Sequence, residues 1–221
     1  MSRLPALLLA PVVLAQATVL RRRTPELEPV IPNGVHRLGA HPEGVVAIGD
    51  STVVGNGLAR AADTSGSGFA DALGASGVTV AGRSGATAGE VLAEFGATVP
   101  AEARAVLVLV GWNDAMRLHG GRRFRRELGA LLDALRAAAP RARIVLAEPP
   151  RFGAFPVLPQ PLRAALGAHA TGLTRIARSL AAERGIPTVA GLDGTSTVAD
   201  GFHPDAEAAR DLGTRAAAAL R

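Results

Sequence analysis

Short aliphatic runs alternate with longer helical patterns from residue 45 to the C-terminus. The clearest run is Ala-Val-Leu-Val-Leu-Val at residues 105–110, which ends at Gly111. Buried strands alternating with helices predict βαβ units, and therefore a parallel sheet with helices on both faces. Pro187 lies inside the last run and predicts that this strand is at an edge of the sheet or starts irregularly. The predicted strands, about five in number, lie at residues 45–48, 78–81, 105–110, 144–147 and 186–189.

Helical patterns fill the intervals between these runs. In residues 125–139, leucines recur on one stripe, and Pro140 follows directly after the stripe ends. A stripe of this width is typical of a helix that buries one face, and a proline just past its end is a common stop signal. The sequence therefore predicts an α/β fold of three layers. The other predicted helices lie at residues 87–95, 162–184 and 205–220.

Composition excludes several classes of protein. A chain of 221 residues suits one domain, and 48% hydrophobic residues argue against disorder. The absence of cysteine excludes disulfides, thiolate metal sites and cysteine nucleophiles. Arginine clusters at residues 21–23 and 122–126 contribute to a net charge of +5, but no long basic face with interleaved aromatic residues is evident. We therefore expect no nucleic-acid partner, and no group of residues has the spacing of metal ligands.

The first 23 residues are mostly apolar and end in Arg21, Arg22 and Arg23. The run is short for a membrane-spanning helix, which needs about 20 apolar residues. Three interpretations stay open: a membrane anchor, a signal cleaved near Ala15-Gln16-Ala17, and a helix packed on the protein itself. The arginines favour membrane association over secretion, with a cytoplasmic location as a further alternative. Residues 24–42 are rich in proline and glycine and predict a linker or irregular arm.

Polar motifs stand at predicted strand ends and before the last predicted helix. They are Gly49-Asp50-Ser51-Thr52, Gly82-Arg83-Ser84-Gly85, Gly111-Trp112-Asn113-Asp114 and Asp200-Gly201-Phe202-His203-Pro204. Each alone is common in turns, because Asn and Asp bond to their own backbone there. Taken together they are informative, because ligands of open α/β sheets bind at the carboxyl ends of the strands.

These residue types are those that acyl transfer needs. Ser51 offers a nucleophile and His203 a base, and Asp200 lies three residues before His203, where it can orient the ring. The backbone N–H groups of Ser51 and Gly82 and the side-chain amide of Asn113 can donate to an oxyanion. Gly82 lacks a Cβ, so a substrate can approach its backbone closely.

The four motifs resemble those of the SGNH (or GDSL) hydrolases, over residues from about 45 to the C-terminus. By that resemblance, Ser51, Gly82, Asn113 and His203 are the four namesake residues, and Asp200 completes an Asp-x-x-His motif. The resemblance implies a flavodoxin-like α/β/α sandwich over residues 43–221 that hydrolyses esters of lipids, acylated sugars or small acyl groups without metal or cofactor. Thr52 stands where the Gly-Asp-Ser-Leu pattern has leucine.

Other residues near the motifs have two possible roles. Trp112, Phe152 and Phe155 are candidate substrate-binding residues, the two phenylalanines lying in a proline-rich loop after the fourth strand. Core packing is the alternative for all three. Asp50 and Asp114 are expected to brace their loops.

The sequence therefore predicts a serine esterase that acts through an acyl-enzyme on a small-molecule or lipid ester. Transfer of the acyl group to an alcohol acceptor is one alternative. A non-catalytic binding module that keeps the fold is the other.

Overall fold

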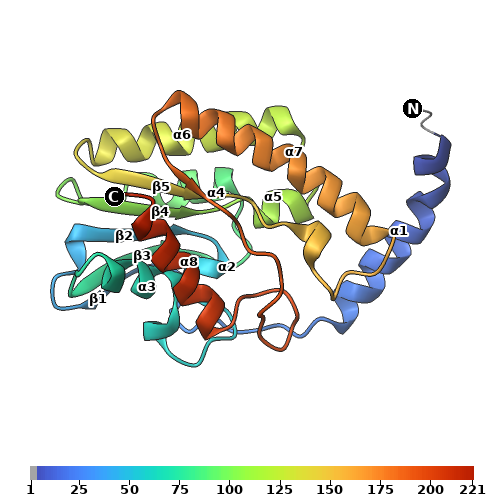
Figure 1. Ribbon diagram of the computed structural model, residues 1–221, viewed down its shortest axis with the longest axis horizontal. Coiled ribbons are helices and arrows are strands. Elements are labelled where there is room, and N and C mark those ends of the chain that lie inside the picture. Colours follow the sequence, from blue (N-terminus) through green and yellow to red (C-terminus); the bar gives the residue numbers. More distant parts are fainter. Residues whose placement is uncertain (1–3) are drawn as a thin grey trace.

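Six strands form one sheet in the order β1-β3-β2-β4-β5-β6 (Figure 1). The computed structural model describes the backbone of residues 4–221 and the side chains of residues 11–221. Strands β2 to β6 are mutually parallel, and β6 lies at an edge, as Pro187 predicted. The strands are β1 (Gly34–Gly39), β2 (Val45–Gly49), β3 (Gly77–Gly82), β4 (Ala105–Leu109), β5 (Arg143–Ala147) and β6 (Thr188–Val189).

The edge strand β1 was not predicted, and the expectation of an irregular arm is wrong for this part of residues 24–42. β1 pairs antiparallel with β3, with Gly34 opposite Gly82. Its residues alternate between half-buried and exposed, and only Val35 and Leu38 are large and apolar. Because an edge strand bonds to one neighbour and buries one face, its apolar pattern is too weak to distinguish it from a loop.

Helices cover both faces of the sheet, which confirms the predicted α/β layers. The helices α4, α6 and α7 pack on one face and α3 and α8 on the other, as Figure 1 shows. Both faces of β2, β3 and β4 are buried, as is typical of parallel sheets. The α-helices are α1 (Leu4–Arg23), α2 (Ser51–Val54), α3 (Ser65–Ala72), α4 (Ala88–Phe95), α5 (Trp112–Met116), α6 (Gly121–Ala138), α7 (Leu162–Glu183) and α8 (Ala206–Ala218), and the 3₁₀ helices are η1 (Pro42–Gly44), η2 (Ala61–Asp63) and η3 (Phe152–Ala154).

The strand order creates a crevice beside β2. The chain leaves β2 toward β3 on one side, and its next strand, β4, lies on the other side of β2. A sheet of this kind opens at such a switch point, at the carboxyl ends of its strands. Gly49 ends β2 there, where a Cβ would lie 1.9 Å from the carbonyl oxygen of Leu109. Only glycine fits this approach, so the residues after Gly49 leave the sheet directly into the crevice.

Helix α1 extends away from the body at the right of Figure 1. Within the described part of the chain, no helix is both long and apolar enough to cross a membrane. The helix contacts the body through the start of α7, and residues 24–33 then run from its C-terminal end to β1.

Candidate active site

Ser51 is the first residue of α2, directly after β2. The carboxylate of Asp50 caps this short helix by accepting the backbone N–H of Thr52 at 3.0 Å. The loop is fixed further by the N–H of Asp50, which donates to the carbonyl of Leu109 on β4. A cap of this kind holds the first turn in place, so the position of Ser51 is set by backbone bonds on both sides of it.

His203 lies in the loop before α8, and its ring faces Ser51. Its Nε2 is 2.8 Å from the Ser51 Oγ, and its Nδ1 is 2.5 Å from Oδ2 of Asp200. The loop closes on itself through a bridge between Thr197 and Pro204 and through the Val198 N–H, which donates to the carbonyl of His203 at 2.9 Å. Two residues that are 152 positions apart in the sequence are therefore within hydrogen-bond distance.

Asp200 is held as an acceptor by its own loop. Its Oδ1 accepts the backbone N–H groups of Phe202 at 2.8 Å and of His203 at 3.0 Å. Burial raises the pKa of this carboxyl, but the bonds from the His203 ring and the two N–H groups outweigh it, and the pKa lies below its usual range. The carboxylate is thus ionised at neutral pH, in the form that can stabilise a protonated imidazole beside it.

Asp50 has the opposite environment, although it neighbours Ser51. Burial raises its pKa to about 6, and the bonds from Thr52 and the positive charge of a protonated His203 oppose this only in part. Its carboxylate points to the helix it caps and makes no bond to the His203 ring among the described contacts. This placement agrees with the structural role expected for Asp50.

The indole of Trp112 lies nearly parallel to the His203 ring. The two ring planes are 13° apart, with centroids at 6.0 Å. The other sides of the indole are packed edge-on by Phe152 at 4.9 Å, Phe155 at 5.3 Å and Phe202 at 6.0 Å. We call Trp112 and these three phenylalanines the aromatic cluster.

Of the two interpretations of Phe152 and Phe155, the aromatic cluster favours core packing. Both side chains are fully buried in the core cluster beneath α7. The proline-rich loop folds inward because Trp112 offers its edges to both rings, and aromatic rings pack favourably edge to face. Trp112 is itself almost fully buried, so it contacts the histidine from inside the protein. Sequence analysis missed Phe202, whose position next to His203 was the one available signal.

Gly82 and Asn113 follow the two strands that flank β2. Gly82 ends β3 with its Cα opposite Gly49, and Asn113 is in α5 just after β4. One N–H of the Asn113 amide donates to the carbonyl of Ala86 at 2.9 Å. The amide carries a second N–H, so it can orient itself with one donor and offer the other. The three strand ends that carry Ser51, Gly82 and Asn113 are therefore neighbours in the sheet.

Asp114 braces the loop that carries Asn113. It is fully buried, accepts the Ala88 N–H at the start of α4, and lies 3.1 Å from the His119 ring. Asp114, His119 and Glu127 each place one atom that could bind a metal within 4.8 Å of the other two. The sequence spacing of these residues did not reveal the grouping. Glu127 also pairs with Arg123 at 2.8 Å. The contacts of Asp114 with the Ala88 N–H and the His119 ring fit the bracing role expected for it.

The segment before β1 contacts the rim of this region, which sequence analysis missed. The Ser84 hydroxyl donates to Oδ1 of Asn56 at 2.6 Å, and the Ser84 N–H donates to Oδ1 of Asn33 at 2.9 Å. Asn56 in turn donates to the carbonyl of Leu27 at 2.7 Å. These bonds tie residues 24–33 to the loops after β2 and β3, so this segment is part of the folded domain.

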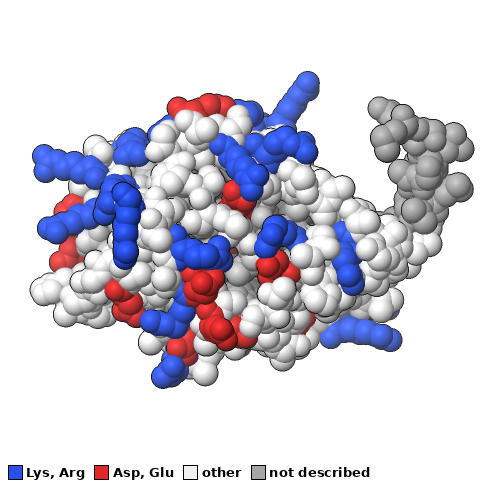
Figure 2. Space-filling view, viewed as in Figure 1, with Lys and Arg blue, Asp and Glu red and all other residues white. Residues whose placement is uncertain are grey.

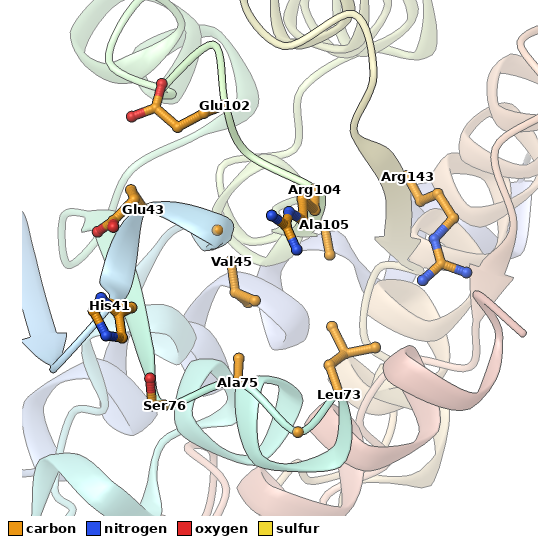
Figure 3. A pocket seen from close by; sticks show the side chains of 12 residues that line it. His41, Glu43, Val45, Leu73, Ala75, Ser76, Glu102, Arg104, Ala105 and Arg143 are labelled. Atoms are coloured by element: carbon orange, nitrogen blue, oxygen red, sulfur yellow. The ribbon is translucent and has the colours of Figure 1, made fainter.

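A separate cavity of about 640 Å³ lies at the opposite end of the sheet. Val45, Ala105 and Arg143 line it, and they begin β2, β4 and β5 (Figure 3). His41 and Ser76 also line it, and no hydrogen bond between them is found in the described part of the chain. Because Ser51 is at the carboxyl ends of the strands, this cavity is not part of the candidate active site.

The fold is that of the SGNH hydrolases. The extracellular lipase from Streptomyces rimosus matches with a TM-score of 0.62 at 23% identity, covering 80% of this chain and 99% of the lipase. Phospholipase A1 from Streptomyces albidoflavus matches with a TM-score of 0.60 at 19% identity, covering 82% and 100%. The aryl esterase of M. smegmatis matches with a TM-score of 0.63 at 18% identity, covering 79% and 96%.

The chain belongs to the GDSL-like lipase/acylhydrolase family, whose model matches residues 47–211. It is therefore a member of a hydrolase family that acts on esters. No curated protein matches the chain significantly.

Proposed function

We propose that the protein is a serine esterase in which Ser51, His203 and Asp200 form the catalytic triad. The observation that carries the proposal is the unbroken line from the Ser51 Oγ through the His203 ring to the Asp200 carboxylate, with distances of 2.8 Å and 2.5 Å. Membership of an ester-hydrolysing family supports the same reaction class.

In the first step, the Ser51 oxygen attacks the ester carbonyl carbon while His203 Nε2 takes the hydroxyl proton. The tetrahedral intermediate then collapses, the bond to the alcohol breaks, and His203 returns the proton to the leaving alkoxide. Water enters, gives a proton to His203 and attacks the acyl-serine carbonyl. The bond to the Ser51 oxygen then breaks, and His203 returns its proton to that oxygen, which releases the acid and restores Ser51. Asp200 stabilises the imidazolium that forms in both steps and fixes which nitrogen faces Ser51.

The oxyanion is held by donors from the three neighbouring strand ends. In this proposal they are the N–H groups of Ser51 and Gly82 and the second amide N–H of Asn113. Such donors stabilise charge where it develops, and they are commonly the largest single contribution to catalysis.

The test is a fluorophosphonate probe combined with Ser51→Ala. We expect the wild-type protein to take up one label on Ser51 and to hydrolyse p-nitrophenyl acetate, and S51A to lose both. Ser84→Ala is the matched control. Ser84 also follows the carboxyl end of a strand, β3, but its hydroxyl bonds to Asn56 and not to a histidine. Full labelling of S51A, or loss of labelling in S84A alone, would contradict the assignment.

A further inference from the structure

The exposed apolar side chains gather at one end of the molecule. In the described part of the chain, the large exposed ones are Val12, Leu14, Val19, Val35, Met116 and Leu118. Three are on α1, Val35 is on β1 beside the carboxyl end of β3, and Met116 and Leu118 close the loop that carries Asn113. An apolar surface that a folded protein leaves exposed is a common mark of an interaction site.

Helix α1 is attached to the body by a narrow stripe. Gln16 donates from Nε2 to the carbonyl of Gln160 at 2.7 Å and accepts the N–H of Leu162 through Oε1 at 3.1 Å. Val13 and Leu20, on the same stripe, pack against the core. The remaining described positions of α1 face solvent, with Leu14 at 66% exposure. The helix therefore has a specific seat on the protein but an outer surface that nothing in the described chain covers.

That seat is at the active-site end. Gln160 and Leu162 belong to the segment that leaves the carboxyl end of β5, the same edge of the sheet at which Ser51 follows β2. Leu118 reinforces this end: it is 63% exposed and has φ of +53°. Left-handed backbone is unfavourable for a leucine, so the turn holds this side chain outward at a conformational cost.

The charge on α1 identifies the partner. The helix contains no acidic residue and ends in Arg21, Arg22 and Arg23, all exposed. Figure 2 shows basic side chains beside the junction of the helix with the body, while the described part of the helix above is uncharged. Apolar side chains next to a cluster of cations match a membrane surface, with acyl chains below and anionic headgroups above.

We infer that α1 and the Met116–Leu118 turn dock the protein on an anionic phospholipid bilayer, and that the active site takes esters presented by that bilayer. The inference rests on the proposed function for its substrate class but not for its binding surface. In this arrangement the exposed apolar side chains of α1 enter the interface, the arginines meet the phosphates, and the carboxyl edge of the sheet faces the lipid.

Binding is measured separately from chemistry. Full-length S51A is mixed with vesicles of phosphatidylcholine alone or with phosphatidylglycerol, and the bound fraction is measured by co-sedimentation. We expect binding to the anionic vesicles that falls about fivefold for each of Arg21, Arg22 and Arg23 changed to glutamine. Val12→Ser/Leu14→Ser/Val19→Ser should also weaken it at least tenfold, because it removes apolar contacts and leaves the Gln16 stripe intact.

The matched control is Arg104→Gln/Arg141→Gln/Arg143→Gln, which removes the same charge from exposed positions at the amino edge of the sheet and should bind like S51A. In the active enzyme, the α1 variants should keep p-nitrophenyl acetate hydrolysis but lose hydrolysis of a phospholipid in anionic vesicles. Loss of acetate hydrolysis in every form would refute the proposed function and leave the binding result standing. Equal binding of all variants, or no binding to anionic vesicles, would overturn the docking surface. So would a dimer of the full-length protein that dissociates only in the triple serine variant, because α1 would then cover a second copy of the chain.

Discussion

Two aspartates close to the same histidine have opposite electrostatic environments. Asp200 is bonded by the His203 ring and two backbone N–H groups, and its pKa is lowered in spite of burial. Asp50 is buried with one backbone donor, and its pKa is raised to about 6. A carboxyl group that must stay ionised needs bonds to its charged form, and only Asp200 has enough of them. The residue three positions from His203, and not the one next to Ser51, is therefore suited to the triad.

Asn113 gives the first prediction at this scale. Asn113→Ala should lower kcat by about 10²–10³, because that is the usual loss on removing one oxyanion donor. The measurement is kcat and KM for p-nitrophenyl acetate, together with a melting curve, since the variant also loses the bond to Ala86.

Asn56→Ala is the control for this variant. It removes a comparable side-chain amide that bonds Leu27 and Ser84. Its only described bond to Ser51 is from the backbone N–H to the Ser51 carbonyl, which the alanine keeps. It should affect stability more than kcat. A change in KM alone for N113A would mean that Asn113 binds substrate and does not act on the transition state.

At the scale of elements, three separate segments meet beside the His203 ring and form the aromatic cluster. Trp112 comes from α5, Phe152 and Phe155 from the segment after β5, and Phe202 from the loop before α8. The Asp200 bond fixes one edge of the imidazole, and the Trp112 indole lies nearly parallel to its plane. Together they restrict rotation of the ring about its side-chain bonds, so that Nε2 stays directed at Ser51.

Trp112→Leu should therefore lower kcat by about tenfold with a smaller change in KM, on the scale of one aromatic pair. It should also lower stability, because a buried indole is replaced by a smaller side chain. Trp112→Phe keeps a flat ring beside His203 and should recover most of kcat even if its melting temperature stays low. If the two variants lose kcat in proportion to their lost stability, Trp112 is only a core residue.

The elements also show what the sequence could predict. The five parallel strands and the motifs at their ends were predictable because each buried strand is a short aliphatic run that ends at a sharp turn. Strand β1 was not, because its partners in β3 are 38 or more positions away and its own residues alternate between half-buried and exposed. Whether Phe152 and Phe155 face the core or a substrate was not predictable either. Their packing depends on contact with Trp112, which lies about 40 positions earlier in the chain, and the sequence of their own loop does not show that contact.

In the molecule as a whole, the two ends of the sheet have different surfaces. The carboxyl edge carries Ser51, His203 and the exposed apolar side chains, while the amino edge carries the open cavity with Arg104 and Arg143. The side chains that a folded protein normally buries are thus exposed at the end where the chemistry is proposed. This asymmetry connects the proposed reaction with the proposed membrane surface.

The stability of the whole molecule should depend on Asp50. Its pKa is about 6 in the folded protein and 3.8 as the ordinary value. Between these values the folded state binds more protons than the unfolded state, so the free energy of unfolding falls as the pH rises from about 4 to about 6. The fall is on the order of 3 kcal/mol, and it persists at higher pH.

Asp50→Asn removes this titration and keeps an oxygen that can accept the Thr52 N–H. Relative to wild type, D50N should gain stability progressively as the pH rises from about 4 to about 6 and hold that gain at pH 7. Urea unfolding of both proteins at half-unit pH steps measures the difference directly. Asp200→Asn is the control of opposite sign. The lowered pKa of Asp200 stabilises the folded state above the ordinary pKa of 3.8, so D200N should be less stable than wild type at pH 5 and above, and the difference should shrink in stronger acid. A D50N difference that does not change with pH would mean that Asp50 stays ionised in the folded protein, and that its bond to Thr52 outweighs the cost of burying its charge.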